Sequence, residues 1–595
     1  MDNETTVVHV THEIVGKIGG IGAVLEGVFT CKSYLNAIGR SILLGPLFST
    51  VGPASTRLGE NSELLYSSID GISKTEFSDV FREIENFYDV GIAYGRRTFI
   101  DKETGIKSSP EVLLIDITHT NNTPVNEFKK HMFERFGIRS HLYEHLWEYE
   151  QYVRLAPAAI AALKAIGAAN HSTTIISHEF MGMPTALAAI LEPMCDFKTI
   201  FYAHEVATVR RIVENHTGHD TMFYNMMKLA HENNLYIDEV FGDQSSFFKH
   251  ALVEASRYCD AICAVGDEIV NELRFLAPDF ETVNIDTVYN GIPAYQISLT
   301  DRLNSKKKLQ KYCDSLLGYE PDFIFTHVTR LIRSKGLWRD VRVLEHIEKE
   351  FRIQGKTGVL FLLSTEISQR RSSDIYRMES EYNWPVAHHE GWPDLSGGEA
   401  IFYTAIQEFN ARSRNIKIIF INQFGFNQAN CGQRMPKDME FMDIRKGSDV
   451  EFGQSIYEPF GISQLEPLTF GGICVVSSIC GCAGFVLDIA GAEGSKNLVF
   501  ADYTKLNGYE SSNIEDLLKI DESVRNQIEH QVSERVAMQI CSRLAKSDFE
   551  IENMIKTGYS LAKNMSWDTV VTNYLLPCLQ EVLDKSGSQV TYTKT

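Results

Sequence analysis

Apolar, β-branched runs alternate with helix-length amphipathic segments along the first half of the chain. The first run is TVVHVTHEI at residues 6–14, and it is followed by the glycine-rich stretch GKIGGIG and an amphipathic segment that ends at Gly39. The same alternation returns with SILLGPLF, EVLLIDI, TTIISHEF, KTIFYAHEV, YCDAICAVGDEI and TVNIDTVYNGIP. Strands that alternate with helices predict an α/β domain with a parallel sheet and helices on both faces.

A second series of apolar runs begins after residues 296–318, a stretch with a basic cluster and no strand pattern. We expect a domain boundary in this stretch. The later strands are expected in DFIFTHVTR, TGVLFLLST, IKIIFINQF, DVEF, ICVVSSI and NLVFADY. The sequence therefore predicts one domain at residues 1–300, a second at 301–560, and a C-terminal helix with a frayed tail at 561–595.

Composition limits the partners that the protein can have. The 595 residues carry a formal net charge of −21, which argues against a broad nucleic-acid surface. The most apolar helical stretch, LAPAAIAALKAIGAA, is interrupted by Lys164 and is shorter than the ~20 apolar residues of a membrane span. The N-terminus lacks the pattern of an export signal, and the 11 cysteines include no C-x-x-C pair. We expect a cytoplasmic protein with reduced thiols and neither nucleic-acid nor membrane partners.

The glycine-rich stretch is the first candidate for binding chemistry. Gly19 and Gly20 lie between a predicted strand and a predicted helix, where backbone N–H groups and the helix N-terminus favour an anion. Lys17 adds a positive charge to the same loop. The alternative is a tight turn without a ligand.

Two further loops follow predicted strands. In HVTRLIRSKGLWRD, Arg330 and Lys335 are suited to a diphosphate, because Arg offers a fork of donors and Lys a point charge. The alternative is a solvated basic loop, and Arg333 could be no more than that. In FYAHEVATVRR, His204 follows a strand and Arg210 lies six positions later, although a lone histidine there is more often structural.

The stretch SIYEPFGISQLEPLTFGG contains two glutamates eight positions apart, Glu458 and Glu466. Ser463 and Glu466 match the S-x-x-E pattern of a helix capping box, and glycines 471 and 472 would end that helix. A capping box explains Glu466 and leaves Glu458 without a role.

Together these motifs resemble a known family. K-x-G-G-I-G, H-x5-R, R-x4-K-G and Y-E-P-F-G-x-S-x-x-E occur here in the order found in retaining glycosyltransferases of the GT-B fold. Over roughly residues 6–580 the chain is similar to eukaryotic-type glycogen synthases and, more distantly, to bacterial glycogen and starch synthases. The resemblance implies two Rossmann-like domains with parallel sheets that face each other across a donor-binding cleft. The N-terminal domain would be the acceptor side, and the C-terminal helix would pack back toward it.

The resemblance also implies an activity, namely transfer of glucose from a nucleotide sugar to the non-reducing end of an α-1,4-glucan, with retention of configuration. Ala23 and Val24 follow the glycine loop where the bacterial type usually has a small residue and aspartate, so UDP-glucose is preferred and ADP-glucose remains the alternative donor. No cofactor and no metal site are expected beyond the nucleotide sugar. A homo-oligomer is left open.

Roles are implied residue by residue. The catalytic residues would be Glu458 facing the transferred sugar, His204 contacting it, and Arg330 and Lys335 neutralising the leaving diphosphate. Glu466 would bind the nucleotide ribose. The other donor-binding residues would be Lys17, Gly19, Gly20, Arg210, Phe460, Gly461 and Ser463.

Alternatives remain at the level of sequence. A retaining GT-B transferase that acts on a small sugar or another polysaccharide fits the same motifs, because acceptor specificity lies in variable loops. A non-catalytic glucan-binding protein is the second alternative. The stretch with Arg525, Arg535 and Arg543 lacks the dense basic cluster that senses sugar phosphates in eukaryotic glycogen synthases, so such activation is not expected.

Overall fold

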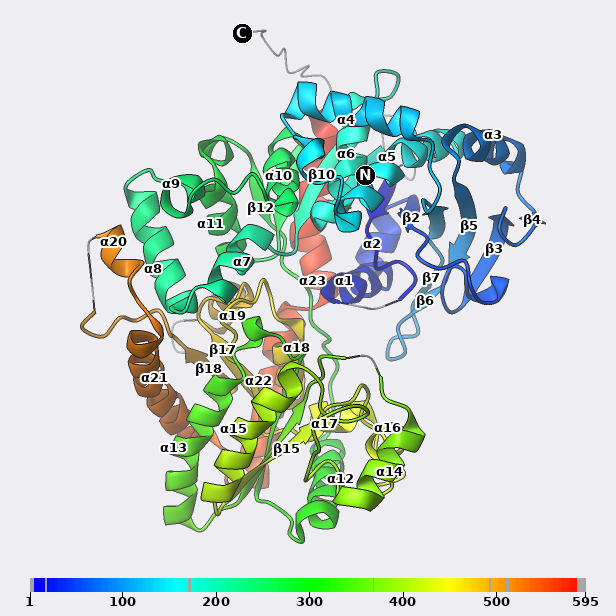
Figure 1. The fold of residues 1–595 in the computed structure, drawn as a ribbon. Helices are drawn as coiled ribbons and strands as arrows, with labels where there is room; N and C mark the ends of the chain where they lie inside the picture. Colours follow the sequence, from blue (N-terminus) through cyan, green and yellow to red (C-terminus); the bar gives the residue numbers. More distant parts are fainter. Residues whose placement is uncertain are drawn as a thin grey trace. The chain divides into compact units, whose positions relative to one another are not determined.

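The computed structural model describes residues 5–16, 19–169, 173–367, 369–491, 494–509, 511 and 513–585. The chain forms two compact units (Figure 1). The first contains the described residues of Met1–Val209, Asn234–Gly291 and Trp567–Thr595, and the second contains those of Arg210–Asn233 and Ile292–Ser566. The junctions at 291 and 566 lie within ten residues of the boundaries expected at 300 and 560, and the contacts add 210–233 to the second unit.

The first unit is built on one large sheet with the strand order β12-β11-β10-β9-β1-β2-β8-β5-β3-β4. The strands from β12 to β8 run parallel, as the sequence predicts, whereas β5, β3 and β4 extend the sheet in antiparallel fashion and were not predicted. The strands of this unit are β1 (Thr6–Val10), β2 (Arg40–Pro46), β3 (Ser62–Ser67), β4 (Ile72–Ser73), β5 (Gly91–Arg97), β6 (Phe99–Ile100), β7 (Lys107–Ser108), β8 (Glu111–Asp116), β9 (Thr173–His178), β10 (Lys198–Ala203), β11 (Ala261–Ala264) and β12 (Ile285–Thr287).

Helices cover this sheet. The amphipathic segment expected to run as one helix to Gly39 is divided into two short helices, because the chain leaves helical geometry at Thr30 and Cys31. The helices are α1 (Gly20–Phe29), α2 (Lys32–Ala37), α3 (Ser78–Tyr88), α4 (Asn122–Phe136), α5 (Trp147–Ala165), α6 (Glu179–Leu191), α7 (Ala207–Asn215, which crosses the unit boundary), α9 (Ile237–Phe241), α10 (Phe248–Glu254), α11 (Asp267–Leu276), α23 (Trp567–Val570) and α24 (Leu576–Asp584).

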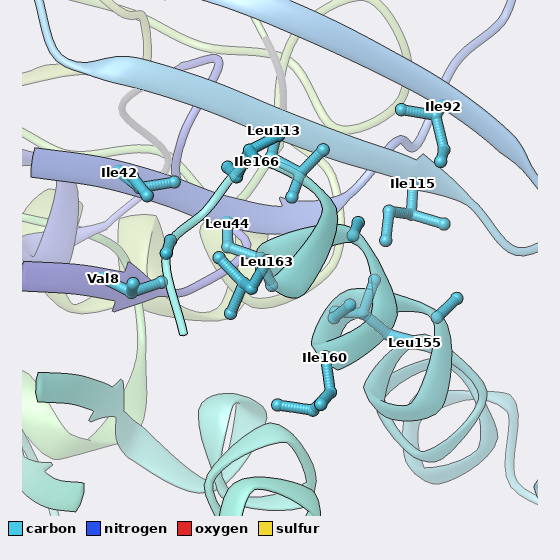
Figure 2. Close-up of a cluster of buried hydrophobic side chains, with 14 of the residues drawn as sticks. Val8, Ile42, Leu44, Ile92, Leu113, Ile115, Leu155, Ile160, Leu163 and Ile166 are labelled. Atoms are coloured by element: carbon cyan, nitrogen blue, oxygen red, sulfur yellow. The ribbon is translucent and has the colours of Figure 1, made fainter. Parts of the chain in front are cut away.

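The core of the first unit lies between one face of the sheet and α5. Figure 2 shows Leu163 of this helix beside Leu44 of β2, and Leu155 and Ile160 belong to the same buried cluster. Val8 and Leu113, on strands β1 and β8, are fully buried in this cluster. Apolar burial of this kind stabilises the fold by roughly 25 cal/mol per Å² of apolar surface removed from water. The sheet is therefore a rigid support for the loops at its edges.

The second unit has a fully parallel sheet with the order β15-β14-β13-β16-β17-β18. The second α/β series predicted from the sequence is thus confirmed. Its strands are β13 (Phe323–Val328), β14 (Gly358–Leu363), β15 (Ile416–Ile421), β16 (Val450–Gly453), β17 (Ile473–Ser477) and β18 (Leu498–Ala501).

Helices lie on this sheet as well, and α13 packs beside α21, as Figure 1 shows. The basic stretch expected to be a boundary forms α12, which begins with a capping box between Ser298 and Asp301. None of the described helices is long and apolar enough to cross a membrane. The helices of this unit are α8 (His219–Glu232), α12 (Leu299–Leu317), α13 (Trp338–Gln354), α14 (Ser372–Tyr382), α15 (Gly398–Arg412), α16 (Gln428–Cys431), α17 (Phe441–Gly447), α18 (Ile462–Leu465), α19 (Cys482–Ala490), α20 (Ile514–Leu517), α21 (Glu522–Arg543) and α22 (Asp548–Asn564).

Candidate functional site

The strand order of the second unit reverses between β13 and β16. In open α/β sheets, ligands bind outside the carboxyl ends of the strands at such a switch point. The loop after β13 carries Arg330 and Lys335, and the loop after β16 carries Glu458. Three residues selected from sequence motifs therefore lie on the two loops that flank this switch point.

Backbone contacts hold these two loops together. The carbonyl oxygen of Ser334 accepts hydrogen bonds from the N–H groups of Ile456 at 2.8 Å and Tyr457 at 3.2 Å. Gly336 has a left-handed φ of 60°, and a Cβ atom at this position would lie 2.8 Å from the carbonyl oxygen of Gln454. Because only glycine tolerates both conditions, the G of the R-x4-K-G motif fixes the spacing of the loops.

An ion pair bridges the switch point. The ammonium group of Lys335 donates to Oε2 of Glu458, and the two side chains are only 15% and 13% exposed. Arg330, in contrast, is exposed and makes neither a hydrogen bond through its guanidinium nor an ion pair with any residue that the structure describes. The arrangement offers an anion one open guanidinium and one ammonium group that already has a carboxylate partner.

The turn after Glu458 is shaped by Gly461. Its φ is 92°, and a Cβ atom there would lie 2.3 Å from Nε2 of Gln464, so a larger residue would displace the buried Gln464 side chain. Phe460 is 2% exposed, and its carbonyl oxygen accepts from the N–H of Cys482 at 3.3 Å. A ligand at this turn would therefore meet backbone groups rather than the Phe460 ring.

Glu466 is held by a buried arginine that the motifs did not identify. Nε of Arg445 donates to Oε2 of Glu466 at 2.8 Å, and Nη1 of Arg445 lies 3.1 Å from Oε2 of Glu451. Arg445 and Glu451 are fully buried, whereas the Glu466 side chain is 28% exposed. Burial alone would lower the pKa of Arg445, but the two carboxylates raise that pKa above its ordinary value, so the guanidinium stays charged.

The capping box expected at Ser463 is wrong. The helix α18 begins at Ile462 with Gly461 as its N-cap, so Ser463 lies inside the first turn and its side chain caps nothing. Its carbonyl oxygen accepts from Arg445 instead. The following turn, Glu466–Phe470, is a separate 3₁₀ helix that ends at Gly471 with φ 81°.

Arg210 belongs to the second unit by its contacts. Its Nε donates to the Glu214 carboxylate at 3.1 Å, and the carbonyl oxygen of Glu214 accepts from Arg333 at 2.9 Å. Arg210 therefore lies close to the loop that carries Arg330 and Lys335. Arg333 has a structural contact in this arrangement.

The glycine loop of the first unit is occupied by a carboxylate of the same chain. Oε2 of Glu13 accepts from the N–H groups of Gly19 and Gly22, both at 2.8 Å. Gly20 is the first residue of α1, and a Cβ atom on it would meet no other atom within 4 Å. Lys17 lies outside the described residues. The structure thus places Gly19 and Gly20 at an anion-binding helix terminus, with Glu13 as the anion.

His204 follows β10 and is supported by Glu179, which follows β9. Oε1 of Glu179 accepts from the backbone N–H groups of His204 and Glu205, and Nε2 of His204 lies 2.8 Å from Nδ1 of His178. Burial lowers the pKa of His204 to about 3. Burial, together with the Glu205 carboxylate, raises the pKa of Glu179 well above its ordinary value, and its φ of 62° is unusual for a residue with a side chain.

The sequence did not select Glu13, His178, Glu179, Arg445 or Glu451. One signal was present, because TTIISHEF and KTIFYAHEV both carry histidine followed by glutamate just before their last residue. Parallel strands that are neighbours bring such pairs side by side. Within the described part of the chain, no group of three or more His, Cys, Asp or Glu side chains is arranged to hold a metal ion.

Comparisons with known proteins identify the fold. No family model matches the chain, and a comparison with curated protein sequences gives no match. Among solved structures, the catalytic domain of starch synthase IV from Arabidopsis thaliana, bound to ADP and acarbose, is similar with a TM-score of 0.51 and 13% sequence identity, over 98% of this chain and 100% of that one. This similarity confirms the fold class, a GT-B architecture with two Rossmann-like units.

Two other solved structures are similar at lower scores. One is a trehalose-6-phosphate protein from E. coli bound with UDP-2-fluoro glucose, with a TM-score of 0.49, 11% identity and coverage of 98% of this chain and 100% of that one. The other is a sucrose-phosphate synthase from Thermosynechococcus elongatus, with a TM-score of 0.48, 10% identity and the same coverage.

Proposed function

We propose that this chain is a retaining hexosyltransferase of glycogen synthase type. It transfers glucose from UDP-glucose to the non-reducing end of an α-1,4-glucan. The observation that carries the proposal is the Lys335–Glu458 ion pair, which two motif-bearing loops bring together at the switch point of the second sheet. The starch synthase that shares the fold was solved bound to ADP and acarbose, which supports a nucleotide sugar as donor.

The charges at the switch point suit the departure of a diphosphate. In the reaction, the bond between the anomeric carbon and the diphosphate oxygen breaks, and negative charge grows on the leaving group. Arg330 and Lys335 neutralise this charge. When Lys335 exchanges Glu458 for a phosphate oxygen, the Glu458 carboxylate becomes available to the donor sugar.

The new bond forms between the acceptor hydroxyl oxygen and the anomeric carbon, on the face from which the diphosphate departs. The leaving phosphate takes the proton of that hydroxyl, so configuration is retained without an enzyme nucleophile. His204 contacts the donor sugar, and Arg210 lies near the diphosphate. Glu466 binds the ribose through the carboxylate oxygen that Arg445 does not hold, and the backbone around Phe460, Gly461 and Ser463 follows the donor.

The remaining donor contacts come from the glycine loop. Gly19 and Gly20 offer backbone N–H groups at the start of α1, and Lys17 adds a positive charge to that loop. Glu13 accepts from two of these N–H groups, so it must be displaced before they can reach a phosphate.

The first test is nucleotide release from UDP-glucose and, separately, from ADP-glucose, each with and without glycogen, while labelled glucose is followed into polymer. Release that requires glycogen and equals incorporation is expected with UDP-glucose. Turnover without polymer growth would indicate a small-sugar or other polysaccharide acceptor. No turnover with either donor would refute the proposal.

Two variants test whether the cations at the switch point contribute to the activity. Lys335→Ala is expected to lower kcat on the order of 10²-fold, since it removes a charge that is more important in the transition state than in the ground state. The matched control is Lys356→Ala, an exposed cation at the opposite, amino-terminal edge of the same sheet, which should leave the rate unchanged. Equal rates for the two variants would contradict the diphosphate assignment.

A further inference from the structure

A chain of buried imidazoles leads to His204 across three neighbouring strands. Nε2 of His204 lies 2.8 Å from Nδ1 of His178, and Nε2 of His178 lies 2.9 Å from Nδ1 of His9. The other ring nitrogen of His9 lies 2.9 Å from the hydroxyl of Tyr34, which is 3.2 Å from Oγ of Ser41. The strands β1, β9 and β10 pair in parallel, so these side chains come together at the carboxyl edge of the sheet.

The inner members of this chain are closed to solvent. His9 is 2% exposed and His178 is 1% exposed. Burial lowers the pKa of His9 to about 3 and that of His178 well below its ordinary value; the His204 and His9 rings lower the His178 pKa further. All three imidazoles are therefore neutral at physiological pH.

Neutral imidazole has one N–H donor and one acceptor nitrogen, and this restricts the whole chain. If Nε2 of His204 carries its proton, then His178 and His9 must each donate through Nε2, and the last donation goes to Tyr34. If the Tyr34 hydroxyl donates to His9 instead, every proton in the chain is reversed. The chain therefore has two self-consistent arrangements, and an intermediate one would leave two acceptors or two donors facing each other in the interior.

The outer ring nitrogen of His204, Nδ1, has a different protonation in each of the two arrangements. Its Nδ1 has no hydrogen-bond partner among the described residues, and the His204 side chain is the only ring of the three with partial exposure. In the first arrangement Nδ1 is an acceptor, and in the second it is an N–H donor. The two buried histidines thus connect to a third whose outer nitrogen is open, which packing alone would not require.

We propose that His178 and His9 are positioning residues, which fix the ring plane and the tautomer of His204 and thereby decide whether its Nδ1 accepts from or donates to a hydroxyl group of the donor sugar. The role in sugar binding rests on the proposed function. The fixed tautomer itself does not. Because every ring is neutral in both arrangements, the two differ in the hydrogen-bonding role of His204 without placing a net charge beside the sugar.

The test uses His178→Leu, which interrupts the chain at its centre. The matched control is His250→Leu, which removes another buried histidine of the same unit, one that lies 3.1 Å from the Thr208 hydroxyl and outside the chain. Histidine labelled with ¹⁵N in the full-length protein reports the tautomer of each ring by NMR, and resonances are assigned by single substitutions. Donor turnover is measured on the same samples.

The wild type should show one neutral tautomer for His204, and His178→Leu should turn this signal into a mixture of tautomers. We expect kcat to fall about 10- to 100-fold, the range known for groups that orient metal-bound histidines, with little change in the KM for donor. His250→Leu should leave both readouts near wild type. If His178→Leu fails to fold, His178→Gln is measured in its place, because it interrupts the chain of imidazoles with a polar side chain.

An unchanged His204 tautomer in a folded His178 variant would overturn the proposal, as would an unchanged kcat in an active enzyme. If no variant, including the wild type, shows any transferase activity, the proposed function fails. The NMR measurement would still decide whether His178 and His9 fix the tautomer of His204.

Discussion

Arg445 offers the sharpest test of how the second unit is held together. Its guanidinium is fully buried between Glu451, which is also fully buried, and Glu466, which is 28% exposed. The substitution Arg445→Met keeps much of the side-chain volume and removes the charge. Two carboxylates then lose their common partner.

The cost follows from the surroundings of the two carboxylates. Breaking a buried ion pair from one side typically costs about 3–5 kcal/mol, because the remaining charge has no counter-ion. Glu451 keeps hydrogen bonds from the Val328 N–H at 3.0 Å and from the Thr326 hydroxyl, which places the expected loss near the lower end, about 3 kcal/mol. Glu466 can regain water, so it adds only a little.

A second substitution distinguishes the cost of the uncompensated Glu451 charge from the loss of Glu466 positioning. In the double variant Arg445→Met/Glu451→Gln, the uncompensated buried charge is gone, and most of the lost free energy of unfolding should return. Donor affinity should remain weak in both variants, because Glu466 is no longer held. The assay is chemical denaturation of the second unit together with equilibrium binding of UDP, and Arg412→Met, an exposed ion-pair arginine in the same unit, is the control.

Two outcomes would refute this reasoning. A loss of less than about 1 kcal/mol in Arg445→Met, the magnitude of an exposed pair, would mean that the triad is not buried as described. Recovery of donor affinity in the double variant would mean that Arg445 does not position Glu466.

Four further predictions concern other parts of the molecule. Glu466→Gln should raise the Kd for UDP while leaving kcat at saturating donor nearly unchanged, and the opposite pattern would contradict a ribose contact. Asp220→Asn should lower the free energy of unfolding by about 3–5 kcal/mol, since Asp220 and its partner Arg339 are fully buried. Hydrogen exchange should rise in residues 210–233, which this pair anchors. Unchanged exchange in these residues would contradict the anchoring role of Asp220. The pKa of both His9 and His204 is lowered from 6.5 to about 3, so the unfolded chain binds protons that the folded one does not, and stability should fall as pH drops from 6.5 toward 3; a flat acid titration would be inconsistent with this. Sugar transfer should persist in excess chelator. A complete loss of transfer that magnesium restores would show that the cations of the loop after β13 are not sufficient to neutralise the leaving diphosphate.

The sequence predicts most of the strands because buried parallel strands are continuous apolar runs. The antiparallel extension was missed because its strands are mixed in polarity, as SELLYS and GIAYGRR show. Residues 210–233 contact the second unit although they interrupt the first in sequence, and the cause is the buried Arg339–Asp220 pair. Such a pair joins residues 119 positions apart, and no local pattern reveals it.

In the candidate site, too, the sequence predicts some of the residues and misses others. Lys335 is selected because it follows a strand and carries charge in a glycine-containing loop, whereas Glu458 is selected through the family resemblance. The motifs do not select Arg445 or Glu451, since a single glutamate within the short strand near DVEF gives no sign of its burial. The ring of His178 was also missed, although its strand was predicted, because the partner of a histidine across a sheet is known only when the strand order is known.

The strand order of the first sheet also reverses, between β9 and β1. This switch point differs in electrostatic character from that of the second sheet, and the difference fits the proposed chemistry. In the second unit, ion pairs surround the reversal between β13 and β16, and in the first unit neutral imidazoles lie where β1 meets β9 and β10. A departing diphosphate gains negative charge and is stabilised by cations, whereas a sugar with oxocarbenium character would be destabilised by an imidazolium beside it. If His204 contacts the donor sugar as we propose, the burial that lowers its pKa would keep a hydrogen-bonding group next to the sugar and exclude a positive charge. A substitution that opened the imidazole chain to water would raise the pKa of His204 toward its ordinary value, and activity should then decline as pH falls through the new pKa, whereas the wild type should show no such decline between pH 5 and 8.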